Sequence, residues 1–186
     1  MKKVLIFMAN GFEEIEAITL VDLLRRANIQ VDMCSITGSL EVTGSHNIQI
    51  KTNLLLEDVN NVLEYDALIT PGGMPGSTYL KENSTVISMI QAFYGKEDKF
   101  IASICASPIV LKAADISCKI EGTCYPGFEE EVSFKQHKQQ AVVQDQNVLT
   151  SMGPGTAFAL GLKLIECLVG KVKAEELYQE TMFAYR

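Results

Sequence analysis

Short apolar segments alternate with helical patterns along this chain of 186 residues, and no other sequence feature constrains the fold as strongly. A strand buried on both faces appears as a short continuous apolar run, whereas a covering helix repeats its apolar residues every three to four positions. Their alternation predicts an α/β protein with helices on both faces of a doubly wound, mostly parallel sheet. The strands are expected at Lys3–Ala9, Gln30–Ile36, Ala67–Thr70, Phe100–Ile104 and Asn147–Thr150.

The helical patterns lie between these strands and in two hairpin-like excursions. Residues 38–52 alternate as a hairpin with its turn at 44–47, and the polar region 118–146 predicts weak strands, a short helix near 128–132 and a second hairpin. No repeat or linker divides the chain, so residues 1–186 are expected to form one domain. The predicted helices are Glu14–Ala27, Thr85–Tyr94, Ala106–Ala114, Thr156–Leu168 and Ala174–Phe183.

Composition and charge exclude several classes of protein. With 47% hydrophobic and 21% charged residues the chain is not disordered, and no apolar run approaches the roughly 20 residues that span a bilayer. A net charge of −7 without a basic stripe argues against binding to nucleic acid or anionic membranes. The five cysteines are odd in number and lack metal-finger spacing, which predicts reduced thiols in a cytoplasmic protein and no metal site.

Cys105 lies where the apolar run ending at Ile104 gives way to the helical pattern beginning at Ala106. This junction predicts a nucleophile elbow, a tight turn that exposes a side chain above the carboxyl end of a strand. A strict elbow has glycine two positions to either side, whereas this chain has the small residues Ser103 and Ser107. A helix starting there would lower the thiol pKa from about 8.5, so a reactive thiol is expected. The segment by itself leaves open that Cys105 only packs as a small hydrophobic residue.

The loop after the first strand carries three glutamates, and ligands of open α/β sheets bind where such loops converge. At about 100° per residue, Glu13 and Glu16 fall on the apolar face of the following helix and Glu14 falls at its edge. An inward-facing carboxylate must be partnered or functional, because burying it alone is costly. Periodicity does not choose between Glu13 and Glu16, and Glu14 is assigned to the helix dipole.

A glycine-rich loop, residues 71–73, is expected beside Cys105 at the same edge of the sheet. The amide of Gly73, together with that of Ala106, can form an oxyanion hole there. A glycine turn without a site is the simpler interpretation of this loop taken alone. The segment Gly153–Thr156 opens a helix but lacks the third glycine of a dinucleotide fingerprint, so no nucleotide cofactor is expected.

Four motifs taken together carry a resemblance to a known family: residues 10–16, 68–73, 102–108 and 150–156. In this order they resemble the ThiJ/PfpI superfamily, and within it the branch of the parkinsonism-associated protein deglycase and bacterial YajL. The resemblance implies a flavodoxin-like fold and a homodimer. It also implies a Cys105 thiolate hydrogen-bonded to a protonated Glu16, with the amides of Gly73 and Ala106 nearby, and so selects Glu16 over Glu13.

The same resemblance implies an activity and two further site residues. In this family the cysteine oxidises readily to a sulfinate, which the glutamate stabilises. Relatives are credited with converting methylglyoxal to lactate without glutathione and with repairing early glycation adducts. The implied substrate is therefore a small 2-oxoaldehyde or a glycated molecule, with no cofactor. Arg26 takes the position of a family arginine near the site. His46 takes the position of a second family arginine, which the partner subunit contributes.

One departure from the family concerns Tyr125. Many members have histidine directly before the proline that follows this position. A phenol with a pKa of about 10 is a poor base at pH 7, so slow dicarbonyl turnover is expected. The adjacent Cys124 is a candidate second redox thiol. Neither histidine, His46 or His137, lies in a loop expected to contact Cys105.

Three functions compete on these grounds. The first is a glyoxalase or deglycase enzyme in which Cys105 adds to the aldehyde and Glu16 moves protons. The second is a redox sensor or holdase chaperone, in which oxidation of Cys105 changes the protein and catalysis is incidental. A hydrolase resembling glutamine amidotransferases is disfavoured, because it needs a histidine base.

Overall fold

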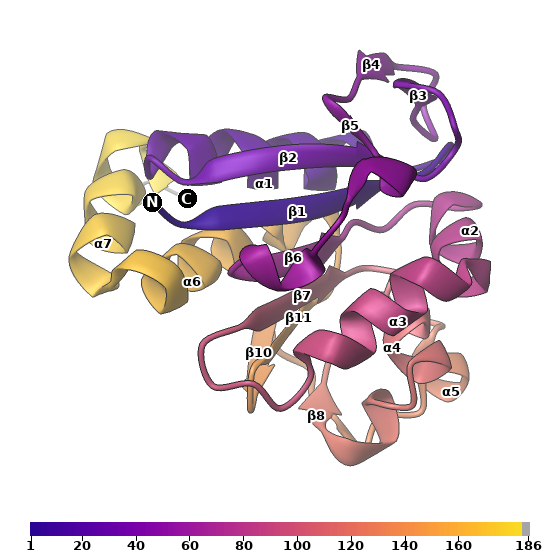
Figure 1. The fold of residues 1–186 in the computed structure, drawn as a ribbon. Helices are drawn as coiled ribbons and strands as arrows, with labels where there is room; N and C mark the ends of the chain where they lie inside the picture. Colours follow the sequence, from indigo (N-terminus) through magenta and orange to yellow (C-terminus); the bar gives the residue numbers. More distant parts are fainter. Residues whose placement is uncertain (184–186) are drawn as a thin grey trace.

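The computed structural model describes residues 1–183 and contains a seven-stranded sheet in the order β10-β11-β7-β6-β1-β2-β5 (Figure 1). Neighbouring strands are parallel except β10 and β11, so the predicted mostly parallel sheet is confirmed. The five predicted strands are all present, each shifted by no more than one residue at either end. The strands of this sheet are β1 (Lys3–Met8), β2 (Gln30–Ser35), β5 (Leu54–Leu55), β6 (Ala67–Thr70), β7 (Phe100–Ile104), β10 (Val142–Asp145) and β11 (Val148–Ser151).

Helices cover both faces of this sheet, as in the flavodoxin-like folds that the sequence predicts (Figure 1). Two short strand pairs lie outside the sheet: antiparallel β3 (Glu41–Thr43) and β4 (Gln49–Lys51), and parallel β8 (Glu121–Gly122) and β9 (Gln136–His137). The helices are α1 (Glu14–Arg26), α2 (Gly76–Glu82), α3 (Ser84–Phe93), α4 (Ile109–Ala113), α5 (Glu129–Val132), α6 (Ala157–Val169) and α7 (Lys171–Glu180).

Strand β1 shows how the two faces acquire separate cores. Its even-numbered residues, such as Ile6, join the cluster formed with α1, α6 and α7, and its odd-numbered residues, such as Phe7, join the cluster formed with α3 and α4. Successive strand side chains point to opposite faces, so a continuous apolar run fills both cores. The run Val4–Met8 is wholly buried for this reason.

Three predicted elements differ from the structure. The predicted helix 106–114 begins only at Ile109, because residues 106–108 form a turn in which the amide of Ser107 bonds to the carbonyl of Ile104 at 3.1 Å. The last helix begins three residues before the predicted Ala174. The second hairpin is formed by β10 and β11, whereas β8 and β9 pair in parallel. Helix α2 was not predicted, since its opening residues are small and polar.

The arrangement of strands brings the loops after β1, β6 and β7 to one edge of the sheet. The amide of Glu13 donates to the carbonyl of Gly72 at 2.8 Å, and the amide of Cys105 donates to the carbonyl of Ser151 at 2.9 Å. This edge lies where the chain proceeds from central β1 to opposite sides of the sheet, the usual ligand position in such folds. The loops therefore meet as expected. Among residues 1–183, no helix is both long and apolar enough to cross a bilayer.

Candidate active site

Cys105 follows β7 directly and has a left-handed backbone, with φ of 66°. A residue other than glycine in this conformation costs about 1–3 kcal/mol and persists only where its surroundings hold it. Here the Cys105 amide bonds to Ser151, and its carbonyl accepts a 2.8 Å bond from the amide of Tyr125. The tight turn expected at Cys105 is therefore present and is fixed by two neighbouring segments.

Three buried hydroxyl groups, linked by hydrogen bonds, hold the turn at Cys105 against β6. The Ser107 hydroxyl donates to the carbonyl of Thr70 at 2.9 Å, the Thr70 hydroxyl donates to that of Ser103 at 2.9 Å, and the two serine hydroxyls lie 3.3 Å apart. All three side chains are fully buried. Serine thus replaces the usual elbow glycines because its hydroxyl is satisfied by β6. Thr70 was not among the predicted site residues, and no local pattern marks it.

Glu16 lies in the first turn of α1 and is fully buried. Its Oε2 atom accepts a 2.8 Å hydrogen bond from the amide of Gly72. Its Oε1 atom is buried and has no nitrogen or oxygen partner within residues 1–183. The carboxyl also interacts with the Cys105 thiol through a hydrogen bond and with the charge of Glu13. A largely uncompensated carboxyl beside a thiol is typical of a reactive site rather than of a structural contact.

Glycine is required between the two reacting groups. A Cβ atom on Gly72 would lie 2.5 Å from Cys105 Cβ and 2.6 Å from Glu16 Oε2, so a side chain there would separate them. The backbone amides of Gly73 and Ala106 are close enough to the Cys105 thiol to lower its pKa. The two amides predicted for the oxyanion hole are thus placed at the nucleophile.

Burial dominates the acid–base properties of the pair. It raises the pKa of Glu16 to about 7, against the lowering effect of the hydrogen bonds from Gly72 and Cys105. Burial, followed by the charge of Glu16, raises the pKa of Cys105 to about 12, although the Ala106 and Gly73 amides lower it. The expectation that a helix dipole lowers this pKa is therefore wrong. Helix α4 begins four residues after the thiol and has only five residues, so its amino end does not act at the sulfur.

The two groups titrate as a pair and hold one proton between them from about pH 7 to about pH 12. When that proton is on Glu16, the negative charge lies on the Cys105 sulfur, facing the two amides. Because the pKa of Glu16 is the lower of the two, the shared proton rests mainly on Cys105, and the thiolate beside a protonated Glu16 that the resemblance implies stays a prediction.

Tyr125 and Cys124 lie beside the elbow with different environments. The Tyr125 backbone bonds to Cys105, and its half-exposed ring lies against Gly153, where a Cβ atom would be 3.2 Å from the ring. Cys124 is buried in a small apolar cluster that includes Val132, and burial raises its pKa to about 12. The structure therefore disfavours Cys124 as a second redox thiol, because a buried neutral thiol is unreactive.

Arg26 and His46, the two other predicted residues, do not reach Cys105 within the chain. Arg26 pairs with Asp22 at 2.7 Å, and it lies ten residues beyond Glu16 on α1, about 15 Å along the helix. His46 is in the β3–β4 turn and contacts Glu14 instead. Within one subunit Arg26 therefore pairs with Asp22 and not with the reactive pair, and its role near the site stays a prediction. The predicted homodimer stays a prediction.

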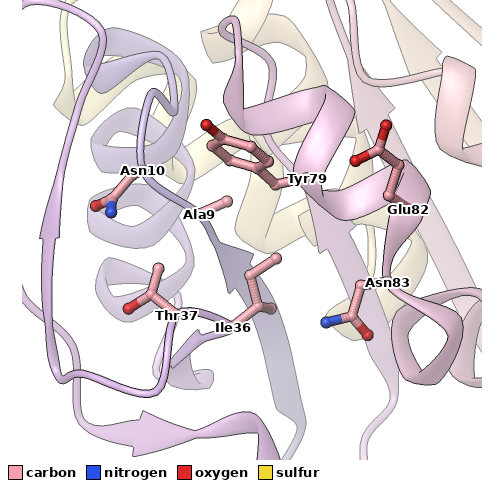
Figure 2. A pocket seen from close by; sticks show the side chains of 7 residues that line it. All are labelled: Ala9, Asn10, Ile36, Thr37, Tyr79, Glu82 and Asn83. Carbon is pink, nitrogen blue, oxygen red and sulfur yellow. The ribbon is translucent and has the colours of Figure 1, made fainter.

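A separate cavity of about 410 Å³ lies at the carboxyl ends of β1 and β2 (Figure 2). It includes neither Cys105 nor Glu16, so cavity size does not mark the reactive centre of this protein. Tyr79 and Asn83, on and directly after α2, lie on one side of it, and Asn10 and Thr37 lie on the other. Its lining residues are Ala9, Asn10, Ile36, Thr37, Tyr79, Glu82 and Asn83.

Sequence comparison finds related proteins over nearly the whole chain. Residues 2–167 match the DJ-1/PfpI family. The chain is 34% identical to protein dj-1beta of Drosophila melanogaster over 99% of this chain and 98% of that protein. It is 32% identical to the glutathione-independent glyoxalase DJ-1 of Schizosaccharomyces pombe, over 96% and 97% of the two chains.

Solved structures show the same fold. The structure of oxidized Toxoplasma gondii DJ-1 superposes with a TM-score of 0.91 at 32% identity, covering 98% of each chain. Drosophila melanogaster DJ-1beta superposes with a TM-score of 0.90 at 33% identity, covering 97% of each chain. The resemblance drawn from the four sequence motifs is confirmed, and the chain belongs to the DJ-1/PfpI family.

Proposed function

We propose that this protein converts small 2-oxoaldehydes to 2-hydroxy acids without glutathione, with Cys105 as nucleophile and Glu16 as its proton partner. The observation that carries the proposal is a buried carboxyl, titrating near pH 7, beside a thiol held on a left-handed turn under two amides. A group that titrates near the working pH can both accept and donate a proton. The named activity of the Schizosaccharomyces pombe relative supports the same chemistry.

The reaction is an internal oxidation and reduction that uses only water. The Cys105 sulfur bonds to the aldehyde carbon C1, and the proton held by the pair moves to the new hydroxyl group. Glu16 then removes the proton from C1, and a proton is returned to C2, which is reduced to an alcohol while C1 becomes a thioester. Water cleaves the thioester, releasing the 2-hydroxy acid and restoring the thiol. The amides of Gly73 and Ala106 stabilise charge on the oxygen or sulfur at each stage.

Lactate formation from methylglyoxal tests this proposal. Cys105→Ala removes the nucleophile and is expected to reduce the rate at least about 10³-fold, because no thioester forms. Cys118→Ala is the matched control, since Cys118 is exposed on the surface, and is expected to retain the wild-type rate. Lactate production by wild type no faster than by Cys105→Ala would refute the enzymatic function.

A second candidate function, oxidation sensing through Cys105, has its own support. Cys105 is only partly buried, and its two amide donors can hold an anionic sulfur oxyacid. The related Toxoplasma gondii DJ-1 structure is of an oxidized protein. Two molecules of hydrogen peroxide oxidise a thiolate to a sulfinate and are reduced to water.

Intact mass after exposure to dilute peroxide tests the sensor function. We expect two oxygen atoms to be added at Cys105 before any are added at Cys118, as located by peptide mapping. Glu16→Asp is expected to slow the second addition, because the shorter carboxyl no longer reaches the sulfur. If Cys118 oxidises first, oxidation sensing by Cys105 is excluded, whatever the result with methylglyoxal.

A further inference from the structure

We infer that Glu13, Glu14 and His46 form a binding site for a divalent transition-metal ion where the β3–β4 hairpin meets the amino end of α1. Each side chain offers one ligand atom, and these atoms all lie within 4.8 Å of one another. None of the three takes part in the chemistry proposed for Cys105. The inference therefore stands apart from the proposed function.

The spacing of the ligand atoms fits a small ion. His46 Nδ1 lies 2.9 Å from Glu14 Oε2 and 3.6 Å from Glu13 Oε2. The Ser45 hydroxyl lies at a fourth corner of the site. Its oxygen is 3.3 Å from Glu13 Oε2, 3.2 Å from Glu14 Oε2 and 3.1 Å from His46 Nδ1. Zinc with ligands at about 2.0–2.1 Å has tetrahedral edges of about 3.3–3.4 Å. Small adjustments would therefore enclose an ion, with the fourth corner left to the hydroxyl or to water.

The negative charge of this site exceeds the positive charge that neighbouring side chains supply. The Glu13 and Glu14 side chains are only 12% and 7% exposed. Among residues 1–183, neither forms an ion pair with a lysine or arginine, and the imidazole of His46 is their shared partner. Two nearly buried carboxylates cost solvation free energy that one imidazole offsets incompletely. A divalent ion would balance both.

The hairpin holds Glu14 in the orientation that a ligand requires. Glu14 Oε1 accepts bonds from the amides of His46 at 2.7 Å and Ile48 at 3.4 Å, which leaves Oε2 to face the other two ligands. Gly44 makes room for this carboxylate, since a Cβ atom there would approach Oε1, Cδ and Cγ of Glu14 closely enough to clash. Fixed ligands of this kind are a feature of metal sites.

The donor set identifies the class of metal. One imidazole nitrogen and two carboxylate oxygens suit Zn²⁺, Mn²⁺, Fe²⁺, Co²⁺ or Ni²⁺ better than Ca²⁺, which takes six to eight oxygens, or Cu⁺, which prefers sulfur.

Calorimetric titration of the full chain with Zn²⁺ tests the site. We expect one ion per chain, bound at least tenfold more weakly by His46→Ala and by Glu13→Gln. His137→Gln, which changes the other histidine of the chain, is the matched control and is expected to bind as wild type does. Unfolding temperatures without metal show that each variant is folded, and added Zn²⁺ is expected to raise that of wild type but not that of His46→Ala.

A cysteine site would give a different pattern. Cys105→Ser is expected to bind Zn²⁺ as tightly as wild type, and Co²⁺ bound to it is expected to lack the near-ultraviolet band of cobalt thiolates. The inference is overturned if His46→Ala binds Zn²⁺ unchanged, if Cys105→Ser loses binding, or if wild type takes up no ion.

Discussion

Glu16→Gln is expected to reduce lactate formation at least about 10²-fold and to make the protein more stable above neutral pH. Glutamine keeps the shape of the side chain and can accept the bond from Gly72, but it cannot take a proton from Cys105. The singly protonated state of the pair, which forms as pH rises through about 7 in the wild type, is then lost. Because the charge of Glu16 raises the pKa of Cys105, alkylation of Cys105 is expected to begin at a lower pH in the variant than in wild type.

The stability change has a defined sign and pH range. Folding raises the pKa of Glu16 from 4.5 to about 7, so its protonated form is favoured in the native state. Wild-type stability is complete below about pH 4.5 and falls as pH rises through 7, by about 3 kcal/mol when the carboxyl is fully ionised. Urea unfolding at pH 4 and pH 8.5 should show the variant gaining on wild type by this amount. Glu130→Gln, on the exposed side of α5, should show no such trend, and a pH-independent difference for Glu16→Gln would contradict the assignment.

Gly73→Ala is expected to destabilise the protein by about 3 kcal/mol and to abolish the reactive site. A Cβ atom there would lie 2.4 Å from the amide nitrogen of Glu13 and 2.4 Å from the carbonyl oxygen of Gly11, both backbone atoms that cannot rotate away. The residue also has φ of +92°, which alanine adopts only with strain. Overpacking costs about 1–3 kcal/mol and a left-handed backbone about 1–2 kcal/mol more.

Gly155→Ala is the matched control for this prediction, because an added Cβ atom there meets nothing within 4 Å. The free energies of unfolding of the two variants, measured in urea, should differ by several kcal/mol if contact of the added Cβ atom with the backbone is the cause. Alkylation of Cys105 should also slow in Gly73→Ala alone, since its amide no longer faces the sulfur. Equal stability of the two variants would show that the loop after β6 relaxes without cost.

The sequence by itself determined the α/β fold, the five main strands and the elbow at Cys105. These features depend on local periodicity: a buried strand must be continuously apolar, and a covering helix must repeat its apolar face. The order of the four motifs also identified the family. The start of α4 at Ile109 was not visible, because the turn at 106–108 depends on the contact that β6 makes with the elbow.

Only the tertiary structure decided how the site is charged. Desolvation sets the pKa values of Glu16 and Cys105, and desolvation depends on how completely the assembled loops exclude water. Arg26 is distant from the site because a helix carries it away, and His46 meets Glu14 across 32 positions of sequence because a hairpin folds back. Local patterns report the periodicity of one segment, whereas charge, burial and ligand geometry arise between segments. These are properties that no single stretch of sequence contains.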